Sequence, residues 1–202
     1  MIAPDFGLAR ELERDVSAYT VGGVRVPSVT ECLAAVGMTD FSHVDPATLA
    51  QAAQRGRMAH AITARIDQGR PVGDIPGYVQ PRVAAYEKFK ADTGFVPELI
   101  EHVVVSASHR YAGTLDRVGL LRRERSLIDL KCSAAVYRSV GRQTAGYAIA
   151  LGEPRMPRYA LRLLPDGSYR LDRLADRADP HTFLACVRVT HALIADGLIT
   201  LD

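Results

Sequence analysis

The 202-residue sequence has few cysteines and no long apolar run. Cys32, Cys132 and Cys186 are scattered along the chain and form no Cys-x-x-Cys pair or Cys/His cluster. This pattern argues against a disulfide framework and against a structural zinc or iron–sulfur site. No segment approaches the roughly 20 apolar residues that span a bilayer, and the N-terminus has no basic start followed by an apolar run. The sequence therefore predicts a cytoplasmic protein with no membrane partner.

The chain also lacks a strong charge of either sign. Its formal net charge of +2 neither requires nor excludes a nucleic-acid partner, so a site for a polyanion must come from local clustering. With 48% hydrophobic and 24% charged residues, the chain has the composition of a folded protein with a core. We predict one domain over residues 1–202, with an N-terminal hairpin and helical part at 1–94 and an α/β core at 95–202.

Capping residues, glycines and hydrophobic periodicity divide the chain into helices followed by a β-rich part. Helices commonly begin at Ser or Asp, often with Pro in the first turn, and end at Gly. Strands show alternation and β-branched residues between turn residues. The predicted elements are a hairpin at 19–26, helices at 28–37, 45–69 and 80–94, β-rich sequence at 99–121, a strand at 126–133, a helix at 134–152, a hairpin at 158–174 and a helix at 179–197. This order predicts an α/β fold.

The strand SLIDLKCS, residues 126–133, carries two charged residues where an apolar strand would serve the core. Side chains alternate across a strand, so Asp129 and Lys131 share one face while Ile128 and Leu130 lie on the other. For a single Asp-x-Lys, the alternative interpretation is an ion pair that contributes about 0–1 kcal/mol to stability. The apolar setting and further polar residues nearby favour a site instead.

Asp116 in the preceding strand can be placed on the same face. If the turn RRER has four residues, Leu121 pairs with Ser126 and Asp116 lies opposite Lys131. A two-residue turn puts Asp116 opposite Asp129. Any even turn length keeps the three charged residues together. Two close carboxylates repel unless a cation lies between them, and hard divalent ions prefer such oxygens, so the pattern indicates a Mg²⁺ or Mn²⁺ site with a lysine beside it.

Two helical stripes carry polar residues on faces that should be apolar. Gln143 and Tyr147 are four residues apart in the helix that follows the Asp-x-Lys strand, so they lie together. His60 follows Gly56 by one turn in the 45–69 helix, where the glycine indicates a close contact with another backbone. The alternatives are a hydrogen-bonded core glutamine and a core histidine. As functional residues, they predict a polar brace and a metal ligand.

The motifs GRMAH (56–60), GTLDRV (113–118), LIDLKCS (127–133) and QTAGY (143–147) resemble, in this order, those of the PD-(D/E)XK nuclease superfamily. The RecB-like and phage-type exonucleases are the branch they are most similar to, and SVTECLAAVG also resembles the start of phage-type members. The resemblance implies a restriction-endonuclease-like core, with a central mixed β-sheet flanked by helices and an N-terminal helical part. It also implies a metal-dependent phosphodiesterase that acts on single-stranded DNA or duplex ends.

The resemblance assigns a role to each matching residue. Asp116 and Asp129 would ligate Mg²⁺ or Mn²⁺ together with the Leu130 carbonyl and His60, and Lys131 would position or activate water. Gln143 and Tyr147 would brace the site or touch DNA, and Glu101 resembles a supporting acid. The four-cysteine cluster of some RecB-like relatives is missing, so we expect no iron–sulfur cluster. Some relatives form ring-shaped oligomers, and the sequence leaves the oligomeric state open.

Basic and aromatic residues near these motifs are candidates for nucleic-acid contacts. Five arginines could follow phosphates or form a solvated face: Arg122, Arg123, Arg125, Arg138 and Arg142. Four aromatic residues could stack on bases or belong to the core: Tyr78, Tyr86, Phe89 and Tyr111. The leading functional hypothesis is a metal-dependent DNA exonuclease. The alternatives are an inactive nuclease-fold protein that binds nucleic acid or serves as a structural subunit, and a globular protein whose acids form salt bridges.

Overall fold

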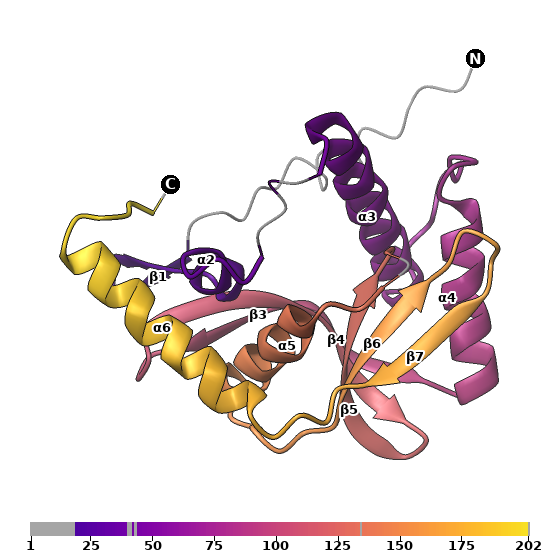
Figure 1. Cartoon of the computed structure of the whole chain (residues 1–202). Helices are drawn as coiled ribbons and strands as arrows, with labels where there is room; N and C mark the ends of the chain where they lie inside the picture. The colour runs from indigo at the N-terminus through magenta and orange to yellow at the C-terminus, as the bar shows by residue number, and fades with distance from the viewer. Residues whose placement is uncertain (1–18, 40–41, 43, 134, 202) are drawn as a thin grey trace.

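The computed structural model describes residues 19–39, 42, 44–133 and 135–201. Figure 1 shows how the elements are arranged. In chain order they are β1 (Tyr19–Val21), β2 (Val24–Val26), α2 (Val29–Ala34), α3 (Pro46–Asp67), α4 (Gln80–Thr93), β3 (Val96–Ser106), β4 (Tyr111–Leu121), β5 (Glu124–Lys131), α5 (Arg138–Ala150), β6 (Arg158–Leu163), β7 (Tyr169–Arg173) and α6 (Asp179–Ala195).

Strands β3 to β7 form a five-stranded sheet in the order β3-β4-β5-β6-β7, and β1 and β2 form a separate hairpin. Neighbouring strands in the large sheet are antiparallel except β5 and β6, which are parallel. A parallel pair needs a crossover connection, and α5 provides it. The predicted α/β class, a mixed sheet flanked by helices, is confirmed.

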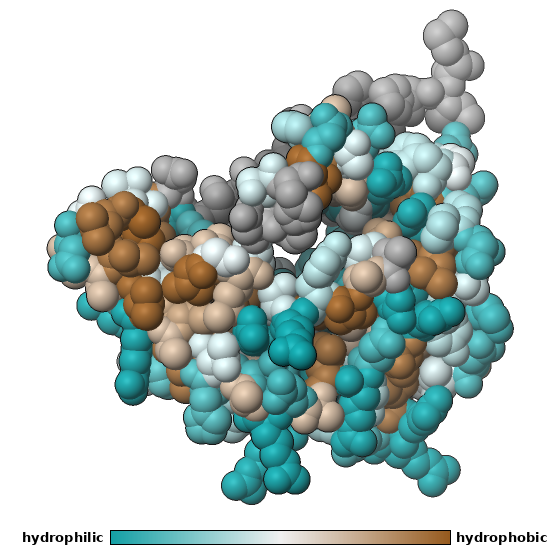
Figure 2. Space-filling view, viewed as in Figure 1, coloured by the Kyte–Doolittle hydropathy of each residue, from teal (hydrophilic) through white to brown (hydrophobic). Residues whose placement is uncertain are grey.

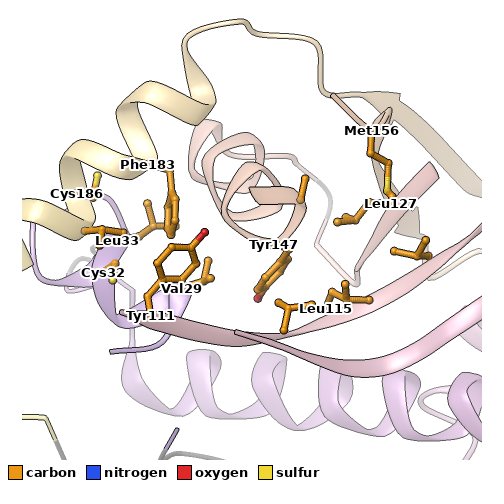
Figure 3. Close-up of a cluster of buried hydrophobic side chains, with 14 residues drawn as sticks. Val29, Cys32, Leu33, Tyr111, Leu115, Leu127, Tyr147, Met156, Phe183 and Cys186 are labelled. Atoms are coloured by element: carbon orange, nitrogen blue, oxygen red, sulfur yellow. The ribbon is translucent and has the colours of Figure 1, made fainter. Parts of the chain in front are cut away.

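The two faces of the sheet pack against different helices (Figure 1). Leu127 of β5 lies in a cluster with residues of α2, α5 and α6, where the Tyr111 and Phe183 rings meet edge to face at 5.0 Å between centroids (Figure 3). The next residue, Ile128, lies in a second cluster with Phe89 of α4. Adjacent residues of β5 therefore serve opposite faces, as the predicted alternation requires.

The N-terminal hairpin and helices form where the capping residues predict them. The Ser28 hydroxyl accepts a hydrogen bond from the Glu31 amide at 3.0 Å, and the Glu31 carboxylate accepts one from the Ser28 amide at 2.6 Å. This reciprocal pair is a capping box that begins α2. Asp45 caps α3 by accepting from the Thr48 amide at 2.8 Å. Both helices thus begin at residues whose side chains replace missing backbone partners.

The turn between β4 and β5 contains two residues, which is the second of the two lengths that the sequence leaves open. Leu121 pairs with Glu124, and Arg122 and Arg123 form the turn. Their φ angles of 51° and 73° lie in the left-handed region, which a two-residue turn matched to the strand twist requires. Asn and Gly usually occupy such positions, so the two arginines in the sequence did not indicate a two-residue turn. The number of turn residues is nevertheless even.

Helix α5 begins later than the sequence predicts. The expected range was 134–152, but the helix runs over Arg138–Ala150, and residue 134 lies outside the described residues. The Ser133 hydroxyl donates to the Ala135 carbonyl at 2.8 Å. A local side-chain bond of this kind competes with helical backbone bonding, which accounts for the later start.

The surface of the sheet and helices is mostly polar in the view of Figure 2, but apolar surface gathers over the C-terminal part of α6. Val189 is 46% exposed, and Leu198, just beyond the helix, is 69% exposed. None of the predicted site residues lies on α6. Within the described part of the chain, no helix has both the length and the apolar character needed to cross a membrane.

Replacing Gly119 should destabilise the sheet, because β3 and β4 approach closely there. A Cβ atom at this position would lie 2.2 Å from the Val96 carbonyl oxygen and 2.8 Å from the Pro97 Cα atom. We expect Gly119→Ala to lower the free energy of unfolding by about 2–3 kcal/mol, measured by urea denaturation.

Gly56→Ala is the matched control, since no atom of the residues that the structure describes lies within 4 Å of a Cβ atom at Gly56. It should raise stability by about 0.5–1 kcal/mol, as expected for glycine inside a helix. Equal stability of Gly119→Ala and the parent protein would mean that β3 and β4 do not meet as described. Among the described residues, nothing packs closely over Gly56, so the close helix contact expected there is not found among them.

Candidate metal centre

The candidate centre lies where regular pairing between β4 and β5 stops. The last regular pair is Arg117 with Ile128, so the register would next bring Asp116 opposite Asp129. The Leu130 amide instead donates to the Asp116 carboxylate at 2.6 Å. A side chain thus takes the place of a strand carbonyl, and the Asp116 carboxylate is held at the opening between the strands.

Three potential metal ligands from three elements meet at this opening: His60 of α3, Glu101 of β3 and Asp116 of β4. Their ligand atoms all lie within 4.8 Å of one another. The His60 Nδ1 atom is 3.4 Å from Asp116 and 3.6 Å from Glu101, and its Nε2 atom is 3.2 Å from the Leu130 carbonyl oxygen. Ligands about 2.0–2.6 Å from one ion have separations of this size, so the group could hold a divalent cation.

Glu101 has an unusual backbone. Its neighbours Ile100 and His102 pair regularly with β4, yet Glu101 itself has a φ angle of 45°. The left-handed region costs a residue with a side chain roughly 1–2 kcal/mol, and such strain concentrates at functional sites. The motif resemblance implies only a supporting role for Glu101, whereas the structure places it among the three potential ligands.

Charge within the group shifts the pKa values of His60 and Asp116 in opposite directions. Burial opposes a charge on His60, but the Asp116 and Glu101 carboxylates together raise its pKa well above the ordinary value. Burial alone would raise the pKa of Asp116, but His60 and then Lys131 lower it below its usual range. A cation bound to the His60 ring would have to displace a proton, so metal affinity should fall as the pH falls.

Asp129 and Lys131 form a second part of the site. Asp129 is 1% exposed, and its Oδ2 atom lies 2.7 Å from the Lys131 ammonium. Despite this ion-pair distance, the same atom accepts no hydrogen bond of good geometry from any described residue. Burial raises the pKa of Asp129 to about 6, although the lysine opposes this shift. A buried carboxylate oxygen with unused capacity is a further potential ligand.

Lys131 connects this carboxylate to α5. Its ammonium donates to the Gln143 side-chain oxygen at 3.3 Å, and the Gln143 amide donates to the Tyr147 hydroxyl at 3.0 Å. Burial would lower the pKa of Lys131, but Asp129 and Asp116 raise it above the ordinary value. Lys131 is therefore a positively charged donor held between Asp129 and Gln143.

A cleft of about 1040 Å³ opens beside the centre, between α3, β3 and the end of β5. His60, Glu101, Leu130 and Lys131 line it. Three arginines that the sequence analysis did not single out line it as well: Arg55, Arg57 and Arg70. They come from α3 and the residues that follow it. Arg55 and Arg57 are two residues apart, which is not the spacing of one helix face, and Arg70 lies beyond the end of α3, so only the fold brings them to the candidate centre.

The five predicted DNA-binding arginines are not gathered at this cleft. Arg122 and Arg123 form the β4–β5 turn, at the opposite end of β5 from Lys131. Arg125, beside them, forms ion pairs with Glu98 and Glu153. Of the other two, Arg138 begins α5, and the Arg142 guanidinium lies 3.1 Å from the Met38 sulfur.

Most of the predicted stacking residues belong to the core. Tyr86, Phe89 and Tyr111 have no exposed surface, and the Tyr111 hydroxyl donates to the Gly146 carbonyl. Tyr78 is 46% exposed. Among the described residues that line the cleft there is no Phe, Tyr or Trp. Base stacking by the three core residues is therefore ruled out.

No family model and no curated protein sequence matches this chain. Among solved structures, the chain is similar to SSO0001, with 14% identity, a TM-score of 0.50 and coverage of 96% of this chain and 87% of that one. It is also similar to LHK-Exo in complex with dAMP, with 13% identity, a TM-score of 0.42 and coverage of 85% and 89%. The similarity to SSO0001 concerns the fold alone. The weaker similarity to LHK-Exo does not indicate a function for this chain.

The ligand group predicts a saturable Mn²⁺ site that depends on Asp116. Asparagine at this position keeps an oxygen that can accept from the Leu130 amide but removes the charge that binds a cation. We expect Asp116→Asn to weaken Mn²⁺ binding at least about tenfold in isothermal titration calorimetry. Asp172→Asn, which breaks a pair with Arg162 on β6 and β7, should leave the affinity unchanged. Equal Mn²⁺ affinity of Asp116→Asn and the parent protein would exclude Asp116 as a ligand.

Proposed function

We propose that this protein is a divalent-metal-dependent DNA nuclease of the PD-(D/E)XK superfamily, in the branch of the RecB-like and phage-type exonucleases. The observation that carries the proposal is the meeting of His60, Glu101 and Asp116 beside the Asp129–Lys131 pair. These residues come from far apart in the sequence, and four of them belong to the motifs GRMAH, GTLDRV and LIDLKCS. Because α3 contributes one of them, we also propose that residues 1–202 act as one nuclease domain.

The donor set fits a hard or borderline divalent cation. His60, Glu101 and Asp116 would hold the ion with the Leu130 carbonyl, and Asp129, which is paired with Lys131, would add a further carboxylate. Oxygen ligands with one imidazole suit Mg²⁺ and Mn²⁺. A bound ion would polarise a phosphodiester and lower the pKa of a coordinated water.

Lys131 supplies a fixed positive charge beside these acids. Because neighbouring carboxylates raise its pKa, it is an ammonium at neutral pH and a hydrogen-bond donor rather than a base. Gln143 and Asp129 limit where the ammonium can lie. It can donate to an attacking water or to a phosphate oxygen, and it offsets the negative charge that develops on phosphorus oxygens during hydrolysis.

The cleft supports DNA as the substrate. Arg55 and Arg57 line its wall, and clustered guanidinium groups bind phosphates. Since the described lining contains no Phe, Tyr or Trp, recognition by these residues would depend on the sugar–phosphate backbone rather than on stacked bases. The second candidate is a nuclease-fold protein that only binds DNA. The complete set of acids and lysine favours the enzyme.

Digestion of end-labelled DNA separates the two candidates. The protein is incubated with single-stranded and duplex DNA and Mn²⁺ or Mg²⁺, with and without a chelator. An exonuclease releases the labelled nucleotide from an end, and chelation stops the release. DNA that is bound but stays intact with both metals would favour the binding protein.

Replacing Lys131 should separate cleavage from binding. We expect Lys131→Ala to cut DNA about 10²–10³-fold more slowly, because it loses the charge that stabilises the transition state. DNA binding in Ca²⁺ should change little, since one phosphate contact is a small part of a multi-contact footprint. The measurements are single-turnover cleavage rates and fluorescence anisotropy.

Lys88→Ala is the control, because Lys88 pairs with Asp92 on the exposed side of α4. It should cut at the parent rate. Lys131→Ala also leaves Asp129 buried without its partner, so circular dichroism must first show that the variant is folded. Parent-like cleavage by a folded Lys131→Ala would remove the lysine from the mechanism and favour the ion-pair interpretation of Asp129 and Lys131.

A further inference from the structure

Behind the candidate metal centre lies a buried arginine that the motif analysis did not single out. Arg117 follows Asp116 in β4 and has no exposed surface. Its guanidinium meets acceptors from two other elements and the β4 backbone. The Nε atom donates to Asp67 at 2.7 Å, Nη1 to Glu101 and to the Asp116 carbonyl at 2.7 Å each, and Nη2 to Thr63 at 3.1 Å.

These contacts connect the elements that carry the three potential ligands. Thr63 and Asp67 follow His60 by three and seven residues, so all three lie on one face of α3. Glu101 belongs to β3, and Arg117 itself follows Asp116 in β4. The Arg117 side chain therefore fixes the relative positions of α3, β3 and β4, which carry the three potential ligands.

The charges around Arg117 leave Glu101 available to a cation. Asp67 is fully buried and balances the guanidinium, while its second oxygen meets the Lys90 ammonium at 2.7 Å. Tyr86 also donates to Asp67, and its ring lies 5.8 Å from the Arg117 guanidinium. Glu101 is different, because its side chain is 34% exposed and faces the cleft. Arg117 thus has a buried counter-charge other than Glu101.

We propose that Arg117 is a positioning residue of the metal centre, which acts by orienting the Glu101 carboxylate toward the cation. This inference rests on the proposed metal-dependent nuclease function. The strained φ of Glu101 supports it, because a left-handed residue in a strand needs a strong partner to hold it. The bond to Arg117 is charge-assisted and short, so it can supply that restraint.

The alternative is a purely structural network that ties α3 and α4 to the sheet. Breaking such a network would lower the melting temperature. Any effect of the break on Mn²⁺ affinity would add to the effect of removing the Glu101 carboxylate. A positioning role makes a different prediction. If Arg117 acts through Glu101, its replacement matters only while the Glu101 carboxylate is present.

A double-mutant cycle tests this distinction. Mn²⁺ affinity and melting temperature are measured for the parent protein, Arg117→Lys, Glu101→Gln and the double variant. Lysine keeps the charge but cannot reach Asp67 and Glu101 with separate fork nitrogens. We expect Arg117→Lys to weaken Mn²⁺ binding about tenfold, in the range found for residues that orient ligands. The double variant should bind Mn²⁺ no more weakly than Glu101→Gln alone. Additive losses, or unchanged affinity in Arg117→Lys, would overturn the proposal.

Arg158→Lys is the matched control. Arg158 of β6 is also a buried arginine with a carboxylate partner, Asp179, but its guanidinium contacts α5 and α6. Its replacement should lower the melting temperature and leave Mn²⁺ affinity unchanged. A comparable loss of affinity in this variant would show that general destabilisation explains the effect, and would also overturn the positioning role.

A milder pair of variants keeps the test decisive if Arg117→Lys does not fold. Thr63→Val removes the hydroxyl that accepts from Arg117, whereas Thr63→Ser keeps it. We expect the valine variant to bind Mn²⁺ at least about threefold more weakly than the serine variant, and equal affinities would contradict the proposal. A parent protein with no saturable Mn²⁺ site would remove the metal centre itself. A parent that binds Mn²⁺ while the variants match it would remove only the role of Arg117.

Discussion

The hydrogen bond from the Leu130 amide to the Asp116 carboxylate is the contact on which the site depends. It ends the regular β4–β5 ladder without leaving a buried donor unpaired, which would cost about 1–3 kcal/mol. The same bond fixes one carboxylate oxygen and leaves the other near His60. This hydrogen bond sets the opening between the strands and the orientation of Asp116. It also leaves the Leu130 carbonyl facing His60.

Helix α3 completes a site that the sheet alone does not form. It contributes His60 directly and, through Thr63 and Asp67, the acceptors that hold Arg117. Polar groups buried between a helix and a sheet stabilise little by themselves, because their desolvation offsets most of the attraction. What they provide is a single relative position of helix and strands. The N-terminal helical part is therefore an integral component of the centre.

Local sequence patterns predicted the elements better than the contacts between them. Alternation in β5 placed Asp129 and Lys131 opposite to Ile128, because the period of a strand leaves no other choice. The length of the β4–β5 turn stayed open between two and four residues, because Arg122 and Arg123 adopt left-handed angles that carry no sequence signature. No sequence pattern indicates the left-handed φ angle of Glu101 either, although this angle determines where the Glu101 carboxylate lies. Arg55 and Arg57 of α3 form no motif in the sequence, and only the fold places them along the same cleft as Glu101 of β3.

The irregular backbone of β3 also affects the edge of the sheet, where a strand of a second molecule could pair. This strand is an edge of the five-stranded sheet, and Val103 and Val105 are exposed along it. A long, regular edge of this kind invites strand addition from a second molecule and aggregation. The register shift between Pro97 and Leu99, followed by the left-handed Glu101, breaks the row of evenly spaced donors and acceptors that a second strand would need. The distortion that turns a carboxylate toward the cleft thus also shortens the regular part of this edge to residues 102–106.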